Sequence, residues 1–533
     1  MITLNNLYKK IKDNKYKVLL IIIVTVISTL PIIMHNLPYG GDINFHLKRI
    51  EAITENIKHG YIGYPIYFKY LNNYGYGSGL FYPDLFLYIP AFLNIFGISL
   101  FTSYKIFLVL IKLASLISIY FSIKSINKNE KSALIAVILY GFSSYCFIDM
   151  FERGALAETI TIVFIPLVIR GIYEIIFGDN KKYYILSFGM LGILFSHIIS
   201  LYLITIFLIL FTLFNIKFLN KEKIKSIIKA IIVFILIGSH FLLPLIEQML
   251  SNKFYYSIQE NVVTYNTVPI LFLFFEFPYY TLMGYTFKRW FPCGIGIIYL
   301  LLCIKYIKNK EKYDRASKCF LISGIICLIF TTKYFWYIPF MKKIFSPIQF
   351  PYRIYILSTA LFITCFTRVM KNINIKKIFL TCLLLFSLNL FYPFCNIVTT
   401  KLLKDEIMNG EYLPVEYKKE NNNGKILNNC KIKYSINNNL KTTIEYKTEC
   451  DEIEVEIPII YYKGYEVKIN DEKIKISKSE NGLIKFKTNQ KEGKISVFYK
   501  GTKLYNVTKY ISITSALCIV IKKVREKKYE QKK

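Results

Sequence analysis

Long apolar runs separated by short basic clusters dominate the chain up to residue 395. Many of these runs reach the roughly 20 residues that an α-helix needs to cross a bilayer. The first, residues 18–34, lacks a small-residue cleavage site and is interpreted as a retained signal-anchor helix. Further runs predict helices at 104–122, 132–148, 158–177, 183–214, 227–249, 290–307, 320–331, 353–366, 378–394 and 510–521.

Two of the apolar runs need a separate interpretation. The run at 183–214 is too long for one span, and a break near His197 to Ser200 predicts two helices there. The run at 85–98 contains Pro90, and the sequence leaves open whether it spans the membrane or is re-entrant or interfacial. The pattern as a whole predicts a polytopic α-helical membrane protein with about twelve transmembrane helices.

Lysine and arginine gather in the short segments between the apolar runs. Under the positive-inside rule, such clusters mark the cytoplasmic side of the membrane. Basic residues before residue 18 and after residue 521 therefore predict a multi-pass protein of the cell membrane with cytoplasmic N- and C-termini. The same alternation places two large loops, 35–82 and 250–289, on the outer side.

The pattern changes after residue 395, where the chain becomes polar and its apolar positions alternate. Ile453, Val455 and Ile457 alternate with glutamates, which predicts half-buried strands. Gly464, Gly482 and Gly493 are expected in turns. We therefore predict a multi-helix transmembrane domain over 1–395, a small extracytoplasmic β-sandwich-like domain over 396–507, and a final helix with a basic tail over 508–533. Whether Cys430 and Cys450 form a disulfide stays open.

The formal net charge of +33 does not indicate a nucleic-acid partner, because the basic residues lie between apolar runs. Their placement predicts contact with anionic lipids instead. Hydrophobic residues make up 54% of the chain and charged residues 19%, which excludes an ordinary soluble domain. No pair of cysteines has the spacing of a zinc site, so no metal site is predicted.

Ionisable residues on the predicted outer side are the candidates for chemistry, because charge at membrane depth is costly. Asp42 and His46 lie four residues apart and would share one face of a helix that starts at Asp42. Asp42 is also a good N-cap residue for that helix. The other outer-side candidates are Glu152, Arg153, Glu158, His197, Arg289 and Arg353.

The first outer loop also contains a glycine- and tyrosine-rich stretch, with Tyr74, Gly75, Tyr76 and, further on, Tyr82. Glycines there allow close approach of the backbone, and the aromatic rings could stack on sugar rings, which predicts a substrate loop. The same composition is also typical of a flexible loop in an interfacial aromatic belt.

Several of these segments together resemble a known family. Gly-Asp42-x-x-x-His46-x-x-Arg49 is followed by Tyr-Gly and Phe-Tyr-Pro, then by Phe-Glu-Arg-Gly-Ala-Leu-Ala-Glu158, Ser-His197 and Gln-Phe-Pro-Tyr-Arg353. In this order they resemble the bacterial YfhO-like membrane proteins, a group that belongs with the GT-C glycosyltransferases. The group overlaps the family labelled "6-pyruvoyl-tetrahydropterin synthase-related domain, membrane protein", although nothing here forms the soluble synthase of that name.

The resemblance implies a GT-C-like fold and transfer of a sugar from a polyprenyl-phosphate donor. The acceptor would be a cell-envelope polymer or lipid outside the membrane. Asp42 would be the catalytic base, or would position the acceptor or a divalent cation, the one cofactor that the resemblance allows. Arg153, Arg289 and Arg353 would bind the lipid phosphate. His46, Glu152, Glu158 and His197 would position the acceptor or donor.

Two other functions fit the sequence. A transporter or flippase for envelope glycans would carry inverted repeats and polar residues at the membrane midplane of both halves. A noncatalytic assembly factor for envelope glycans would retain its function without Asp42.

Overall fold

The structure is a computed structural model that contains no ligand. It describes residues 15–34, 42–71, 73–258, 267–275, 280–283, 286–289, 294–308, 313–369, 373–395, 410–417, 427–428, 433–438 and 442–532. The predicted domain boundary at 396 and Cys430 lie outside these residues.

The chain forms two compact units, and neither is continuous in sequence. The first unit comprises Met1–Leu47, Ile98–Phe234 and Asn261–Leu403, and the second comprises Lys48–Gly97, Ile235–Glu260 and Lys404–Lys533. Each is described by itself below.

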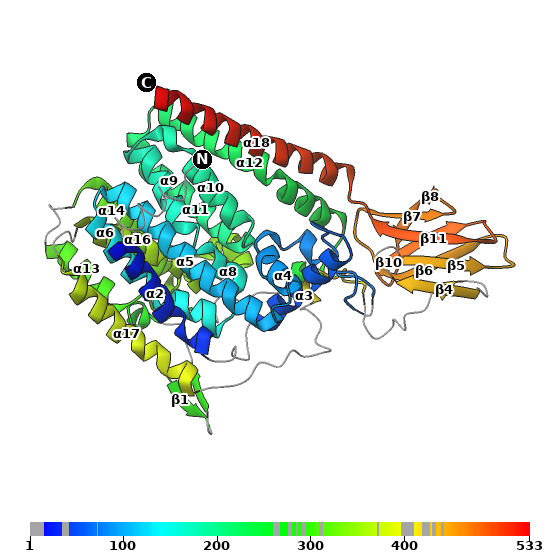
Figure 1. The fold of residues 1–533 in the computed structure, drawn as a ribbon, viewed down its shortest axis with the longest axis horizontal. Helices are drawn as coiled ribbons and strands as arrows, with labels where there is room; N and C mark the ends of the chain where they lie inside the picture. The colour runs from blue at the N-terminus through cyan, green and yellow to red at the C-terminus, as the bar shows by residue number, and fades with distance from the viewer. Residues whose placement is uncertain are drawn as a thin grey trace. The chain divides into compact units, whose positions relative to one another are not determined.

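The first unit is a bundle of apolar helices (Figure 1). Its helices are α2 (Lys15–Met34), α5 (Leu100–Asn127), α6 (Glu130–Gly141), α7 (Ser144–Phe147), α8 (Leu156–Thr161), α9 (Ile165–Phe177), α10 (Tyr184–Leu194), α11 (Ile198–Phe214), α13 (Ile297–Lys308), α14 (Arg315–Phe330), α15 (Pro339–Phe345), α16 (Tyr355–Val369) and α17 (Ile375–Cys395), with a hairpin of β1 (Tyr280–Met283) and β2 (Thr286–Arg289). Helix α3 (Ile43–Lys58) begins in this unit, and α12 (Lys221–Ser251) contributes its first half.

Five helices of the described chain are long and apolar enough to cross a membrane, which fits a membrane protein. They are α2, α5, the continuous stretch Leu156–Phe177, α12 and Lys503–Lys522 of α18 (Lys503–Lys532). The pair Glu130–Gly141 and Ser144–Glu152 makes a sixth if its 49° bend lies within one broken span. The larger number of about twelve spans stays a prediction.

The predicted break in the long apolar tract is confirmed, because α10 ends at Leu194 and α11 begins at Ile198. The run at 85–98 folds as η2 (Leu85–Leu87) and α4 (Tyr88–Ile95), which together are too short to cross a bilayer.

The second unit contains the predicted C-terminal strands, arranged in two sheets (Figure 1). A four-stranded sheet has the order β3 (Leu427–Asn428), β6 (Ile453–Ile460), β10 (Leu483–Thr488) and β9 (Ile476–Lys478). A five-stranded sheet has the order β4 (Lys433–Asn438), β5 (Thr442–Lys447), β11 (Glu492–Tyr499), β7 (Tyr465–Ile469) and β8 (Glu472–Ile474). Side chains from both sheets share one core, which includes the predicted alternating positions Ile453, Val455 and Ile457. Burial of these alternate positions explains the strands.

The turns of this domain follow the sequence in part. Gly464 and Gly482 have positive φ and lie between strands, as predicted. The prediction of a turn at Gly493 was wrong, because that residue pairs within β11. The tight turn between β7 and β8 instead uses Asn470 and Asp471, both with positive φ, as a two-residue hairpin of this type requires.

The glycine-rich part of the first outer loop packs against the β domain within the second unit. The amide of Ile460 donates to the carbonyl of Tyr74 at 2.9 Å. A Cβ atom at Gly77 would lie 2.8 Å from the ring of Tyr462, which is buried. The glycine at 77 is therefore explained by close packing of an aromatic ring on the backbone.

We expect Gly77→Ala to destabilise the protein by about 1–3 kcal/mol, because its φ of −84° tolerates alanine and the cost is steric overlap with Tyr462. Thermal unfolding of the purified protein measures the effect. Tyr462→Leu should remove the overlap, so the double variant should lose less stability than the sum of the single variants. An unchanged unfolding temperature for Gly77→Ala would mean that this packing does not form.

Candidate functional site

A group of charged side chains lies after the bend in the apolar stretch 130–152. After α6, residues Phe142 and Ser143 interrupt the helix, and α7 continues into a π-helical turn, η3 (Ile148–Glu152). Such turns are rare and often occur at functional sites. Gly154 then adopts a φ of +60°, and a Cβ there would lie 2.0 Å from Cγ1 of Ile43. This turn needs glycine because the start of α3 passes directly against it.

Arg153 is the centre of this group. Its Nη1 donates to Asp149 Oδ1 at 2.5 Å and to Glu158 Oε2 at 3.0 Å. It also donates to the hydroxyl of Tyr145 at 3.1 Å, and that hydroxyl donates to Glu158 Oε1 at 2.7 Å. The side chain of Asp149 is fully buried and that of Glu158 is 1% exposed, so both carboxylates depend on the arginine for compensation.

Arg353 brings a second cation to the same group. It lies in η12 (Pro351–Ile354), and its Nε is 3.3 Å from Glu158 Oε2. Its Nη1 donates to the carbonyl of Ile348 at 2.9 Å. The guanidinium carbons of Arg153 and Arg353 lie 5.6 and 5.0 Å from the centre of the Phe350 ring. Neither arginine donates a hydrogen bond from Nη2 to any residue that the structure describes.

Asp42 is held at this group through its backbone. Its amide donates to the carbonyl of Arg153 at 2.9 Å, and its own carbonyl accepts from the amide of His46 at 3.0 Å, which opens α3. The half-buried carboxylate accepts no hydrogen bond within the described part of the chain, so it does not act as a side-chain N-cap. Burial raises the pKa of Asp42, while the nearby positive charges of Arg153 and Arg353 lower it and Glu158 raises it.

Tyr104 of α5 faces the same acids. Its hydroxyl lies close enough to Asp42 and Asp149 for their charges to act on it. The side chain is fully buried, and the hydroxyl has no hydrogen-bond partner among the described residues. It is therefore a donor available to a ligand or a water molecule beside Asp42.

The charges of this group do not balance. If every group is ionised, three carboxylates (Asp42, Asp149 and Glu158) face two guanidinium groups (Arg153 and Arg353), which leaves one negative charge. An excess negative charge in a buried site favours uptake of a proton or a cation. Among the described residues, no three or more His, Cys, Asp or Glu side chains are placed to hold a metal ion.

Other residues predicted for the site lie at differing places in the first unit. His46 is buried one turn after Asp42. His197 precedes α11 with its Nδ1 2.8 Å from the Ser200 hydroxyl, and Ser200 and Arg353 line the same small cavity. Glu152 ends η3, and Arg289 ends β2, where its side chain lies outside the described part.

The predicted substrate loop belongs to the second unit, and its aromatic rings are engaged by protein. Tyr74 and Tyr76 are buried, with their rings 6.1 and 6.4 Å from those of Tyr417 and Tyr412. Tyr82 is half-buried and its ring lies 4.3 Å from the guanidinium carbon of Arg49. Sugar contact by Tyr74, Gly75, Tyr76 and Tyr82 stays a prediction, and it would require this packing to open.

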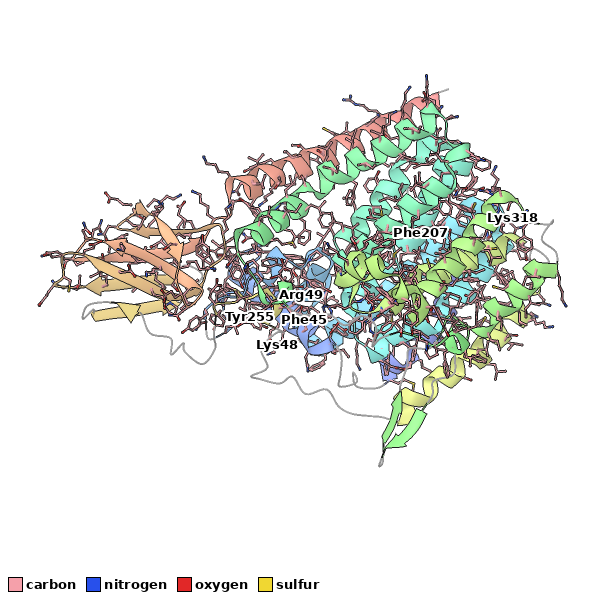
Figure 2. All side chains as sticks on the ribbon, turned by 180° about the vertical axis from the view of Figure 1, so that it is seen from behind. Phe45, Lys48, Arg49, Phe207, Tyr255 and Lys318 are labelled. Carbon is pink, nitrogen blue, oxygen red and sulfur yellow. The ribbon has the colours of Figure 1, made fainter. Side chains whose placement is uncertain are left out.

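Arg49, labelled on α3 in Figure 2, has a structural partner that the sequence did not suggest. Its Nη2 donates to Asp84 Oδ1 at 2.6 Å and to the carbonyl of Pro83 at 2.8 Å. Tyr67 donates to the other carboxylate oxygen of Asp84 at 2.7 Å. The arginine of the Asp42-to-Arg49 segment therefore joins α3 to the end of the outer loop.

Sequence reasoning also missed Asp149, Tyr145 and Tyr104. Asp149 could have been found, because it is a carboxylate directly after the apolar run 132–148 and four residues before Arg153, and such a residue needs a partner. The two tyrosines carried no signal, since the chain has 44 tyrosines and many lie in apolar runs.

We expect Arg153→Met to destabilise the protein by about 3–5 kcal/mol, because it leaves two buried carboxylates without their shared cation. The thermal unfolding midpoint checks this. Adding Asp149→Asn should restore part of the loss. The control Arg170→Met removes a cation whose Nε lies 4.0 Å from Glu174, and should cost less, because Glu174 keeps the Ser125 hydroxyl, the Asp179 amide and Lys182 as partners. Equal losses for the two single variants would contradict a central role for Arg153.

No family model matches the chain. The chain is similar to an uncharacterized protein of Lactococcus lactis subsp. cremoris (strain MG1363), with 24% identity over 330 residues. The similarity covers 57% of this chain and 52% of that protein, so the chain matches about half the length of this relative. This similarity to a bacterial protein therefore assigns no activity to the chain.

Proposed function

We propose that the protein is a GT-C-type membrane glycosyltransferase. It would transfer a sugar from a polyprenyl-phosphate donor to a cell-envelope polymer or lipid outside the membrane. The observation that carries this proposal is the carboxylate of Asp42, which is half-buried and free of hydrogen bonds to described residues while two arginines lie nearby. A carboxylate that served only the fold would be expected to use its lone pairs.

In this reaction Asp42 is the general base. An acceptor hydroxyl attacks the anomeric carbon of the donor, a new carbon–oxygen bond forms, and the hydroxyl proton moves to Asp42. The bond from the anomeric carbon to the phosphate oxygen breaks, and its electron pair leaves with the lipid phosphate. The excess negative charge at the site makes it a good acceptor for that proton. Burial favours the same outcome, since it raises the pKa of Asp42.

Arg153 and Arg353 stabilise the leaving phosphate. Guanidinium binds phosphate in bidentate geometry, and each arginine has an Nη2 with no hydrogen-bond partner among the described residues. Their Nη1 atoms and the Nε of Arg353 are held by Asp149, Glu158 and Ile348. This arrangement would orient both cations before a substrate arrives.

A multi-pass topology with about twelve spans, and with the β domain outside, belongs to the same proposal. Two observations support it. Most of the basic clusters alternate with the apolar runs as the positive-inside rule requires. In addition, Cys450 of the β domain is disulfide-bonded, and disulfides persist in oxidising compartments outside the cytoplasm.

We expect Asp42→Asn to reduce sugar transfer by about 100-fold or more, because the amide cannot accept the proton. The variant is expressed at the native level in a strain that lacks the protein, and the surface glycans are analysed by mass spectrometry. Glu51→Gln is the matched control, since it neutralises a half-buried acid of α3, the helix that Asp42 precedes, and this acid pairs with Lys48 at 3.5 Å.

The pH dependence gives a second readout of the same step. The base acts only when deprotonated, so sugar transfer should fall as the pH decreases. Because the pKa of Asp42 is raised, this fall should begin at a higher pH than it would for an aspartate with an ordinary pKa. Full glycosylation by Asp42→Asn would overturn the role of Asp42 and favour a noncatalytic assembly factor.

The proposed topology predicts opposite labelling of two exposed positions. A membrane-impermeant maleimide added to intact cells should modify Glu480→Cys, next to the Asn481 turn of the β domain. It should modify Glu222→Cys, at the start of α12, only after permeabilisation. Labelling of Glu480→Cys only after permeabilisation would overturn the topology, and with it the proposed outer-side reaction.

A further inference from the structure

The segment between α14 and η12 is a short amphipathic platform, defined here as residues 333–345. It consists of η10 (Lys333–Tyr337) and α15 (Pro339–Phe345), and it is too short to cross a bilayer. It is held to the first unit by two buried aromatic residues. Trp336 is 1% exposed and donates from Nε1 to the carbonyl of Phe330 at 3.1 Å, and the Phe345 ring packs 4.9 Å from that of Phe330.

The opposite side of the platform exposes large apolar and aromatic side chains. Tyr337 is 69% exposed, Phe340 58% and Tyr334 54%, with Ile338 and Ile344 also exposed. Tyrosines such as Tyr334 and Tyr337 are enriched where a bilayer meets water, because their rings are apolar and their hydroxyl groups are polar. The platform is therefore suited to the headgroup level of a membrane.

All charged residues of the platform are basic. Lys333, Lys342 and Lys343 are exposed, and the sequence contains no acidic residue between Asp314 and Asp405. A basic, aromatic surface at headgroup level complements anionic phospholipid, and each lysine near such a surface strengthens binding by about fivefold. Zwitterionic lipid would satisfy the apolar side chains but would offer no net negative charge to the lysines.

We propose that the platform 333–345 binds the headgroups of anionic phospholipids. It would thereby hold the following segment, which carries Phe350 and Arg353, at the membrane boundary. This inference rests on the membrane placement proposed above, and it does not depend on the reaction at Asp42.

The test uses the full-length protein in phosphatidylcholine vesicles that contain brominated lipids, which quench tryptophan on contact. A reporter tryptophan is introduced by Phe340→Trp, or by Tyr337→Trp if the first variant does not fold, and its quenching is taken as the difference from the native protein, which has two tryptophans. Brominated phosphatidylglycerol should quench the reporter at an at least about fivefold lower mole fraction than brominated phosphatidylcholine. Lys342→Gln with Lys343→Gln should strongly reduce this preference, because only Lys333 of the platform lysines then remains, while quenching by phosphatidylcholine persists.

The control reporter is Ile209→Trp on α11, a helix without charged residues where Ile209 is 54% exposed. It should be quenched equally by both brominated lipids. Equal quenching of the platform reporter by both lipids, or its quenching only by aqueous iodide, would overturn the proposal. If the α11 reporter were not quenched by lipid either, the proposed membrane placement would fail as well.

Discussion

The paired burial of Arg153 with Asp149 and Glu158 is the interaction on which the helical unit depends. A carboxylate inside an apolar bundle is costly unless a cation and hydrogen bonds compensate it. One guanidinium nitrogen serves both acids here, at 2.5 and 3.0 Å. The three residues lie within ten positions of each other, and the backbone between them passes through the π-helical turn and the positive φ of Gly154. This segment also presents the carbonyl that holds the amide of Asp42.

A second buried arginine organises the other unit by the same physical principle. Arg49 pairs with Asp84 and lies on the ring of Tyr82, while the Tyr67 hydroxyl donates to the second carboxylate oxygen of Asp84. The glycine-rich stretch packs against the β domain, where the ring of Tyr462 lies directly against the backbone of Gly77. In both units an arginine fixes the local path of a chain segment, because a buried guanidinium constrains direction as well as distance.

The difference between Asp42 and its neighbours is what gives the charged group functional interest. Asp149 and Glu158 accept hydrogen bonds from Arg153, Thr159 and Tyr145, and Arg353 forms an ion pair with Glu158. Asp42 is positioned by its backbone alone and leaves its carboxylate available within the described chain. Tyr104 adds a buried hydroxyl donor without a partner among the described residues. A binding or catalytic centre typically has supporting residues that are fully hydrogen-bonded, as Asp149 and Glu158 are here. It also has groups available to a ligand, as the Asp42 carboxylate and the Tyr104 hydroxyl are.

The sequence by itself determined the elements, because hydrophobic burial has a local period. The apolar runs became helices, the break before Ile198 was located, and the alternation at Ile453, Val455 and Ile457 marked a strand. Tertiary structure decided which polar residues converge. The sequence did not reveal the role of Asp149, and it did not identify Asp84 as the partner of Arg49. Ion pairs join positions whose separation in sequence follows no fixed period. Tertiary structure also decided that the glycine-rich loop packs on Tyr462, because only the folded β domain brings that ring to Gly77.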